Sequence, residues 1–324
     1  NHVDLGSLPI GTTDFTVEFW YKSNPDASDP AIFSNKDWNS GSNTGINFNF
    51  QSTGNVFKIN FKGATGVRKD LTINGFTFTS GWNHIAVTVS RADSLKCYLN
   101  GIQKGAVLIS GSTGDITSVH TYKLGQDGTG NYTYQPTGKL DEFRIWNAAL
   151  SQTQIQDRMC TELSGTEPGL LLYYPFNDSP GSTVQDLTTN YPGTLQNGAA
   201  ASWTTSGAPI GNQSTYLYTT AWTGTNLSLN GTSGSVVLDN ISGTHKGIQF
   251  YKVNGAPINQ NGIPLLSATN DYFGVFYVEA NGSSSVMHLD YSGNTDAQAN
   301  ESNIILFSRA ANNTTPWLDA SATI

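Results

Sequence analysis

The chain has 324 residues, which is enough for two domains with buried cores, and its formal net charge is −8. Charged residues make up only 12 % of the sequence, and Lys and Arg form no run. Nucleic acid and anionic membrane surfaces require clustered positive charge, so neither is an expected partner.

The composition is typical of a secreted β-protein with many turns. The sequence contains 34 Gly and is crowded with Asn, Ser and Thr, which keep it soluble with amides and hydroxyls in place of charge. No segment approaches the roughly 20 apolar residues that cross a bilayer, so we expect no membrane insertion. Asn1 begins almost directly in a strand pattern, and we expect the sequence to be cut from a longer extracellular or cell-surface protein.

Three segments of the first half alternate apolar and polar residues with period two, and each begins or ends in Gly or Asn. They are 81–89, 95–101 and 138–147. Their β-branched and aromatic content favours half-buried antiparallel strands over helix. The short turn 90–94 predicts that the first two segments form a hairpin, and the third supplies another strand of the same sandwich.

One convincing helix follows, over residues 151–160. Ser151 is a suitable N-cap, and Gln154 stands three residues later in the capping-box position. Leu150, Ile155 and Met159 fall close to one face, so we expect a lone amphipathic helix that lies on the sandwich.

Four sequence phrases recur here in the order found in a known family. They are FTVEFW, WNHIAVTVS, LKCYLNG and GKLDEFRIWNAALS. Together they resemble the laminin G-like, concanavalin A-like jelly rolls of the pentraxin and lectin superfamily. The resemblance covers the first half of the chain and implies a curved two-sheet sandwich that binds carbohydrate or a protein ligand. It does not imply catalysis, because one fold hosts many functions.

The segment 169–198 has two open interpretations. In the resembled family a block of this kind usually opens a domain, whereas here it follows one. It either adds edge strands to the first sandwich or begins a second copy. We favour the first, because no second WNHIAVTVS-like phrase follows, and we expect the laminin G-like jelly roll to span residues 1–210.

The remaining residues, 211–324, predict a second and smaller domain after the small-residue linker 207–212. Seven short apolar runs separated by Gly, Asn and Ser turns are typical of an immunoglobulin-like or fibronectin-like β-sandwich. The domain also resembles modules that follow lectin-like domains in bacterial secreted or surface proteins. The fold class is thus all-β throughout. Cys97 and Cys160 are either bridged or both small buried residues.

The sequence argues against an enzyme. Retaining glycosidases need two carboxylates about 5–5.5 Å apart, and the Glu-x-Asp-x-x-Glu pattern of the resembled glycanases is absent, as is the Gln-x-His pattern of the lyases. Asp141 and Glu142 are adjacent in a strand, so they should point to opposite faces. His84 is more simply a packed strand residue than a proton donor. A divergent lyase or hydrolase remains the least favoured alternative.

Two loops rich in oxygen donors, 34–45 and 126–134, predict a calcium site. The resemblance implies a rim calcium held by one acid from each loop, which assigns Asp37 and Asp127 as ligands, with Asn39 and Asn131 as amide donors. The alternative is that both acids cap their own turns.

A second calcium is conceivable at the strand termini. The jelly-roll glycanases that the chain resembles often hold a structural ion there, which would place Asp141 beside Asp4. The alternative is that Asp141 bonds a neighbouring turn.

Aromatic residues on the same two loops predict a sugar platform, because a pyranose offers an apolar face and a ring of hydroxyls. Trp38, Tyr132 and Tyr134 are the candidates, with Asn39 as a polar contact. Other aromatics occur within strand patterns and are expected in the core: Trp20, Trp82, Phe143 and Trp146.

We therefore expect a non-catalytic, calcium-assisted carbohydrate-binding or adhesion module of a larger secreted or surface protein, with a polysaccharide or glycan as partner. The alternative is a structural spacer, or a segment of an adhesin that binds a cell-surface protein.

Overall fold

The structure is a computed structural model, and it divides into two compact units, Asn1–Ile155 with Leu163–Thr204 and Gln156–Glu162 with Thr205–Ile324. The unit boundary thus falls at residue 204, compared with the expected 210, and residues 156–162 belong to the second unit. The described residues are 1–23, 29–38, 42–51, 55–76, 81–178, 180–198, 200–231, 234–257, 259–263, 271–290, 292, 298–299, 307–309 and 316–319.

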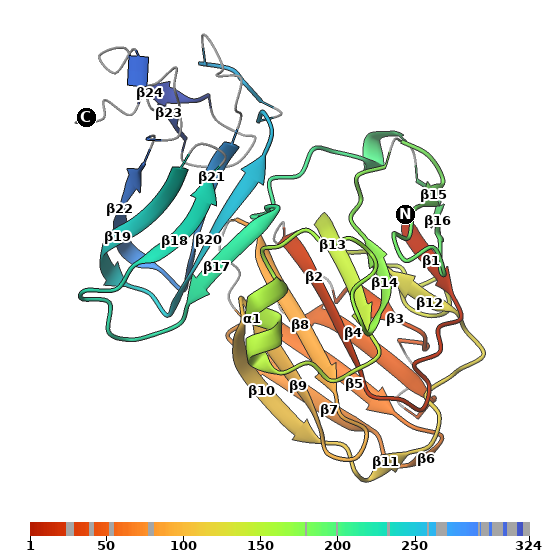
Figure 1. The fold of residues 1–324 in the computed structure, drawn as a ribbon. Coiled ribbons are helices and arrows are strands. Elements are labelled where there is room, and N and C mark those ends of the chain that lie inside the picture. The colour runs from red at the N-terminus through yellow and green to blue at the C-terminus, as the bar shows by residue number, and fades with distance from the viewer. Residues whose placement is uncertain are drawn as a thin grey trace. The chain divides into compact units, whose positions relative to one another are not determined.

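The first unit is a sandwich of two antiparallel sheets (Figure 1). The eight-stranded sheet has the order β15 (Thr183–Val184), β16 (Gly193–Gln196), β1 (His2–Gly6), β12 (Tyr122–Leu124), β3 (Ala31–Ser34), β4 (Gly45–Gln51), β5 (Val56–Lys62) and β7 (Lys69–Asn74). The six-stranded sheet has the order β10 (Ile102–Leu108), β9 (Ser94–Leu99), β8 (Asn83–Val89), β2 (Phe15–Ser23), β13 (Gly138–Trp146) and β14 (Leu170–Tyr174). A two-stranded sheet joins β6 (Thr65–Gly66) to β11 (Ser112–Thr113), and a short 3-10 helix, η1, spans Ala200–Ser202.

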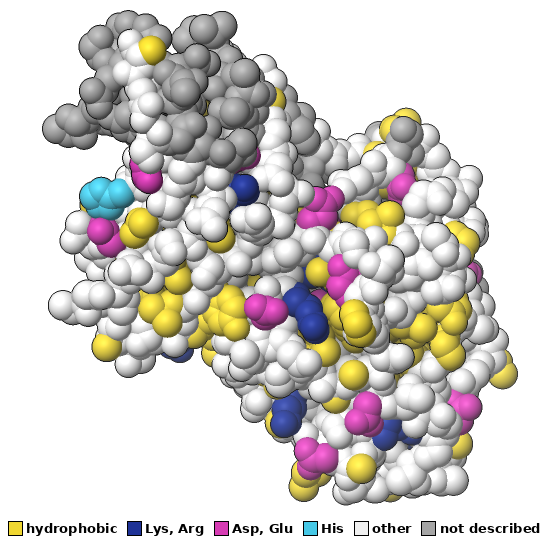
Figure 2. All heavy atoms as spheres, in the orientation of Figure 1, with side chains coloured by type: hydrophobic (Ala, Val, Ile, Leu, Met, Phe, Trp, Pro, Cys, Tyr) yellow, Lys and Arg dark blue, Asp and Glu magenta, His cyan; other side chains and the backbone are white. Residues whose placement is uncertain are grey.

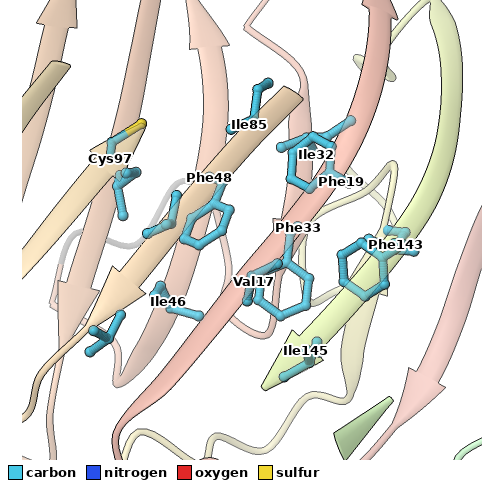
Figure 3. Packing of buried hydrophobic residues seen from close by; sticks show 14 of the residues in the cluster. Val17, Phe19, Ile32, Phe33, Ile46, Phe48, Ile85, Cys97, Phe143 and Ile145 are labelled. Carbon is cyan, nitrogen blue, oxygen red and sulfur yellow. The ribbon is translucent and has the colours of Figure 1, made fainter. Parts of the chain in front are cut away.

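The core lies between the two sheets and is rich in aromatic rings (Figure 3). Phe33 of β3 lies 5.8 Å from Phe143 of β13 between ring centroids, so the sheets pack directly on each other. Alternate residues of each strand enter this core, as the period-two pattern predicts. The four aromatics expected in the core are all buried: Trp20, Trp82, Phe143 and Trp146. The all-β jelly-roll prediction is confirmed.

The helix is confirmed as α1, Gln152–Arg158. Its capping box forms as predicted, because the Ser151 N–H donates to Gln154 Oε1 at 2.9 Å and the Gln154 N–H donates to Ser151 Oγ at 3.3 Å. Ile155 packs against residues on the outward face of the six-stranded sheet, among them Ala86 and Trp146. In the described part of the chain no helix is long and apolar enough to span a bilayer.

The segment 169–198 folds back onto the first sandwich, as favoured. β14 pairs with β13, and β16 pairs with both β1 and β15. The predicted hairpin is present as the antiparallel pair β8–β9. Cys97 and Cys160 are both buried and form no disulfide with each other, which decides between the two alternatives for them.

The described residues of the second unit form three small antiparallel sheets. They are β17–β20–β21 (Gln213–Leu217, Gly247–Asn254, Asp271–Val278), β18–β19–β22 (Leu227–Gly231, Gly234–Thr244, Asn281–Leu289) and β23–β24 (Phe307–Ser308, Leu318–Asp319). An expected strand at 304–307 falls mostly outside the described residues. The immunoglobulin-like or fibronectin-like fold of the second unit stays a prediction.

Charge is sparse on the surface, as the composition implies. Figure 2 shows Lys, Arg, Asp and Glu side chains scattered among uncharged groups on the face in view. A local concentration of charge is therefore informative in this protein.

Candidate functional site

The two loops singled out from the sequence meet in the structure. The Trp38 N–H donates to Asp127 Oδ2 at 3.0 Å, and the Gly128 N–H donates to the Lys36 carbonyl oxygen at 2.8 Å. A Cβ placed on Gly128 would lie 2.5 Å from the Lys36 nitrogen, so the approach of the two backbones requires glycine. The loops that follow β3 and β12 thus form one continuous rim.

Three aromatic side chains on this rim touch one another. The ring centroids of Trp38 and Tyr132 are 5.7 Å apart at 69°, and those of Tyr132 and Tyr134 are 5.7 Å apart at 72°. These are edge-to-face contacts, which favour a defined arrangement of the rings. Tyr134 is 52 % exposed, whereas Trp38 and Tyr132 are half-buried. We call Trp38, Tyr132 and Tyr134 the aromatic cluster; Asn39 lies outside the described residues.

The Asp127 carboxylate accepts hydrogen bonds from both loops of the rim. Its Oδ1 accepts from the Thr129 N–H at 3.0 Å, the Thr129 hydroxyl at 2.7 Å and the Gly130 N–H at 3.2 Å, while Oδ2 accepts from Trp38. Four donors on one buried carboxylate match the turn-cap alternative. A cation at Oδ1 would have to displace three donors, so the surroundings of this oxygen favour a turn cap over a calcium ligand.

Two of the other expected calcium ligands lie in the described residues. The side-chain amide of Asn131 is exposed and donates to the Thr129 carbonyl at 3.3 Å, while Asp37 is half-buried. Among the described residues no group of three or more His, Cys, Asp or Glu side chains could hold a metal ion. The rim calcium stays a prediction from the sequence, because the described residues present no set of acidic or histidine ligands for it.

The second proposed pair, Asp4 and Asp141, lies on strands that do not pair with each other. β1, which carries Asp4, pairs with β12 and β16 in the eight-stranded sheet, whereas Asp141 lies on β13 of the six-stranded sheet. Burial alone would raise the pKa of Asp4, but bonds from Gly6 and Thr121 and the nearby charge of Lys123 lower it below its usual value. Asp141 Oδ1 accepts from the Glu142 N–H at 3.0 Å.

A row of polar residues crosses the entire eight-stranded sheet, and sequence reasoning missed it. Each strand contributes one residue, directly opposite the next: Thr183, Thr194, Asp4, Lys123, Ser34, Asn47, Asn60 and Asp70. We call these residues the polar row. Their chain neighbours lie in the core, among them Val3, Phe48, Ile59 and Leu71. The row therefore lies on the side of the sheet that faces away from the core. Its end residues reach solvent, whereas four of its members are buried: Lys123, Ser34, Asn47 and Asn60.

The rim and the polar row border the same face of the sheet. A Cβ on Gly130, in the loop that carries Asp127, would lie 3.3 Å from Lys123 Cε and 3.9 Å from the His2 ring. His2 and Lys123 both lie on the outward side, because Val3 and Leu124 are core residues. The loop that carries Tyr132 and Tyr134 thus reaches the polar row at Lys123. The sequence signal for the row was the alternation of amide and aromatic residues over 47–50.

His84 belongs to a buried network on the other sheet. Arg144 Nη2 lies 2.5 Å from Glu142 Oε2, and Arg144 Nη1 lies 3.7 Å from Glu18 Oε1. Tyr173 donates its hydroxyl to Glu142 at 2.7 Å. Burial first, and then the Arg144 charge, hold the pKa of His84 well below its usual value, although Glu18 Oε2 lies 3.6 Å from its Nε2. These acids are engaged with Arg144 inside the protein, so the packing role expected for His84 fits.

The comparisons with known proteins agree with this fold. A family model described as the concanavalin A-like lectin/glucanases superfamily matches residues 1–156, and the two-sheet sandwich of the first unit agrees with that match. The description covers both lectins and glucanases and does not decide between binding and catalysis. No curated protein matches the sequence.

Among solved structures, a protein of Bacteroides ovatus proposed to bind carbohydrate is 19 % identical with a TM-score of 0.49; the match covers 60 % of this chain and 55 % of that one. The Ruminococcus gnavus IT-sialidase CBM40 with bound sialyllactose is 15 % identical with a TM-score of 0.39, covering 48 % and 90 %. A pentraxin of Limulus polyphemus is 20 % identical with a TM-score of 0.38, covering 48 % and 73 %. Identities of this size assign no functional residue to this chain.

Proposed function

We propose that the first unit is a non-catalytic carbohydrate-binding domain of a secreted or cell-surface protein. It holds glycan against the outward face of the eight-stranded sheet. The observation that carries the proposal is the aromatic cluster of Trp38, Tyr132 and Tyr134 beside the polar row. A pyranose ring stacks its C–H face on aromatic rings, and its hydroxyls exchange hydrogen bonds with amides and carboxylates.

The absence of catalysis is part of the proposal. A retaining mechanism needs two carboxylates that can flank one glycosidic bond. Glu18 and Glu142 are both buried and both lie beside Arg144, which ties them into the protein. Hydrolysis of a polysaccharide by the purified chain would contradict this part of the proposal.

The sequence also predicts that calcium assists glycan binding. The binding experiment tests this prediction. The four donors around Asp127 argue against an ion there. Binding should therefore be measured with added calcium and with a chelator.

The test is a glycan array probed with the intact chain, followed by titration calorimetry on the best ligands. Trp38→Ala should abolish binding, and Trp38→Phe should restore part of it, because stacking needs an aromatic face. If no glycan binds under either calcium condition, the spacer or protein-binding alternative replaces this function.

A further inference from the structure

Positive charge gathers at one end of the polar row. Lys58 and Lys62 lie on the outward side of β5, since Phe57, Ile59 and Phe61 enter the core. Lys58 Nζ lies 3.6 Å from Asp70 Oδ2, and Arg68 Nη2 lies 2.5 Å from the same oxygen.

Asp70 is the carboxylate at the centre of this group. Besides the two cations, it accepts a bond from Asn60 Nδ2 at 2.9 Å. Asp70 thus interacts with two cations and one amide, and its single negative charge neutralises only one of the two positive charges.

Lys36 adds a buried cation to the same group. Its side chain is 1 % exposed, and its Nζ has no hydrogen-bond partner. Burial, then the charge of Arg68, lowers the pKa of Lys36 to about 8, with Asp70 and Asp37 acting the other way and Lys62 adding to the decrease. An ammonium group held in this environment without a partner is costly to the folded state.

Cations outnumber acids in this group, whereas the whole chain is acidic. Four cations (Lys36, Lys58, Lys62 and Arg68) stand against two acids (Asp37 and Asp70), a local charge of +2. The whole chain carries −8. We call these six residues the cationic group.

A second polar atom at this end of the row lacks a partner. Asn47 is fully buried, stands opposite Asn60, and its Oδ1 accepts no hydrogen bond. A buried acceptor without a partner adds to the cost that Lys36 imposes on this end of the sheet.

We propose that the cationic group is an anion subsite of the binding face, and that the ligand is an acidic polysaccharide whose carboxylate or sulfate groups it receives. The inference rests on the proposed function and names the chemical class of its ligand. The aromatic cluster would hold the sugar ring, and the cationic group would select the charged residue of the same polymer.

The test compares matched polymers by titration calorimetry on the intact chain. Polygalacturonate is paired with its methyl-esterified form, and dextran sulfate is paired with dextran. These arms separate a carboxylate from a sulfate as the preferred anion. We expect the charged member of at least one pair to bind about tenfold tighter, with a preference that weakens as salt rises.

Variants assign that preference to residues. Lys36→Met and Lys62→Gln should each reduce it, whereas Lys96→Gln should not, because Lys96 lies on β9 of the other sheet. Should Lys36→Met fail to fold, Lys62→Gln alone decides the assignment.

Two results would overturn the inference in distinguishable ways. Equal affinity for charged and neutral members, or equal losses in all three variants, removes the anion subsite and leaves the carbohydrate-binding function in place. Failure of every glycan on the array to bind removes the proposed function itself, and the subsite with it.

Discussion

The backbone of Trp38 is tied to the side chain of Asp127, 89 residues away, by a 3.0 Å hydrogen bond to Oδ2. The remaining bonds of that carboxylate close its own turn. A single buried side chain thus holds both loops of the rim, and the position of the aromatic cluster depends on it.

Asp127→Ala should therefore weaken both the fold and the binding. Removing the acceptor of four hydrogen bonds leaves buried N–H donors unpaired, which should lower the free energy of unfolding by about 3 kcal/mol. Urea denaturation measures the loss, and calorimetry should show weaker glycan binding. Asp127→Asn keeps one carbonyl acceptor and is the matched control, with a smaller loss. An alanine variant as stable as the wild type would show that these bonds do not hold the rim.

Chelation tests calcium directly. An ion bound at a hundredfold excess over its dissociation constant would stabilise the protein by about 2.7 kcal/mol. Because Asp127 is occupied by protein donors, we expect EDTA to leave the melting temperature and the glycan affinity unchanged. A lower melting temperature in EDTA that calcium restores would reinstate the metal site predicted from the sequence.

Stability should decrease in acid through His84. Its folded-state pKa lies well below its usual value, and an unfolded histidine titrates near pH 6.5. The unfolded state therefore binds more protons below that pH, so stability is complete above about pH 6.5 and is lost as the pH falls below it. Urea midpoints at pH 7 and pH 5 measure this effect. His84→Gln should reduce the difference between the two values, and an unchanged difference would assign it to other groups.

Lys36→Met should stabilise the protein while weakening its binding to acidic glycan. Replacing a buried amine that has no partner with an apolar chain of similar length removes a cost of about 1–3 kcal/mol. The melting temperature at pH 7 shows whether the variant is more or less stable than the wild type. A destabilised variant would mean that the amine contributes to the fold.

The pH dependence of Lys36 gives a separate check. Its folded pKa of about 8 lies below the usual value of 10.5, so its cost to the folded state is present below pH 8 and fades as the pH rises toward 10.5. The same loss of charge should reduce the preference for acidic glycan between pH 7 and pH 9. The Lys36→Met variant should show neither change.

The first domain could be predicted from the sequence because its strands carry period-two patterns and ordered family phrases. The helix could also be predicted, since the Ser151–Gln154 capping box is a local signal. The contact between the loops at Asp37 and Asp127 was expected from the resemblance, and the structure brings the Trp38 backbone to Asp127.

The polar row could not be found in this way. It depends on the register of eight strands, and local periodicity does not determine which residues of distant strands stand opposite each other. Backbone irregularity also escaped prediction. Strict alternation was assumed for Asp141 and Glu142, but the β13–β2 register shifts between Asp141 and Arg144, and Glu142 has a φ of +53°. Likewise, nothing local to Lys36 indicated that its amine would be buried.

The register that aligns the polar row also protects the sheet against mispairing. If β4 slipped by one position against β5, Asn47 and Asn49 would turn toward the interior and Phe48 would face water. A slipped pairing would place both amides in the apolar core and remove Phe48 from it, so folding favours the native register. The residues that we assign to ligand recognition thus also help the chain to reach a single native pairing.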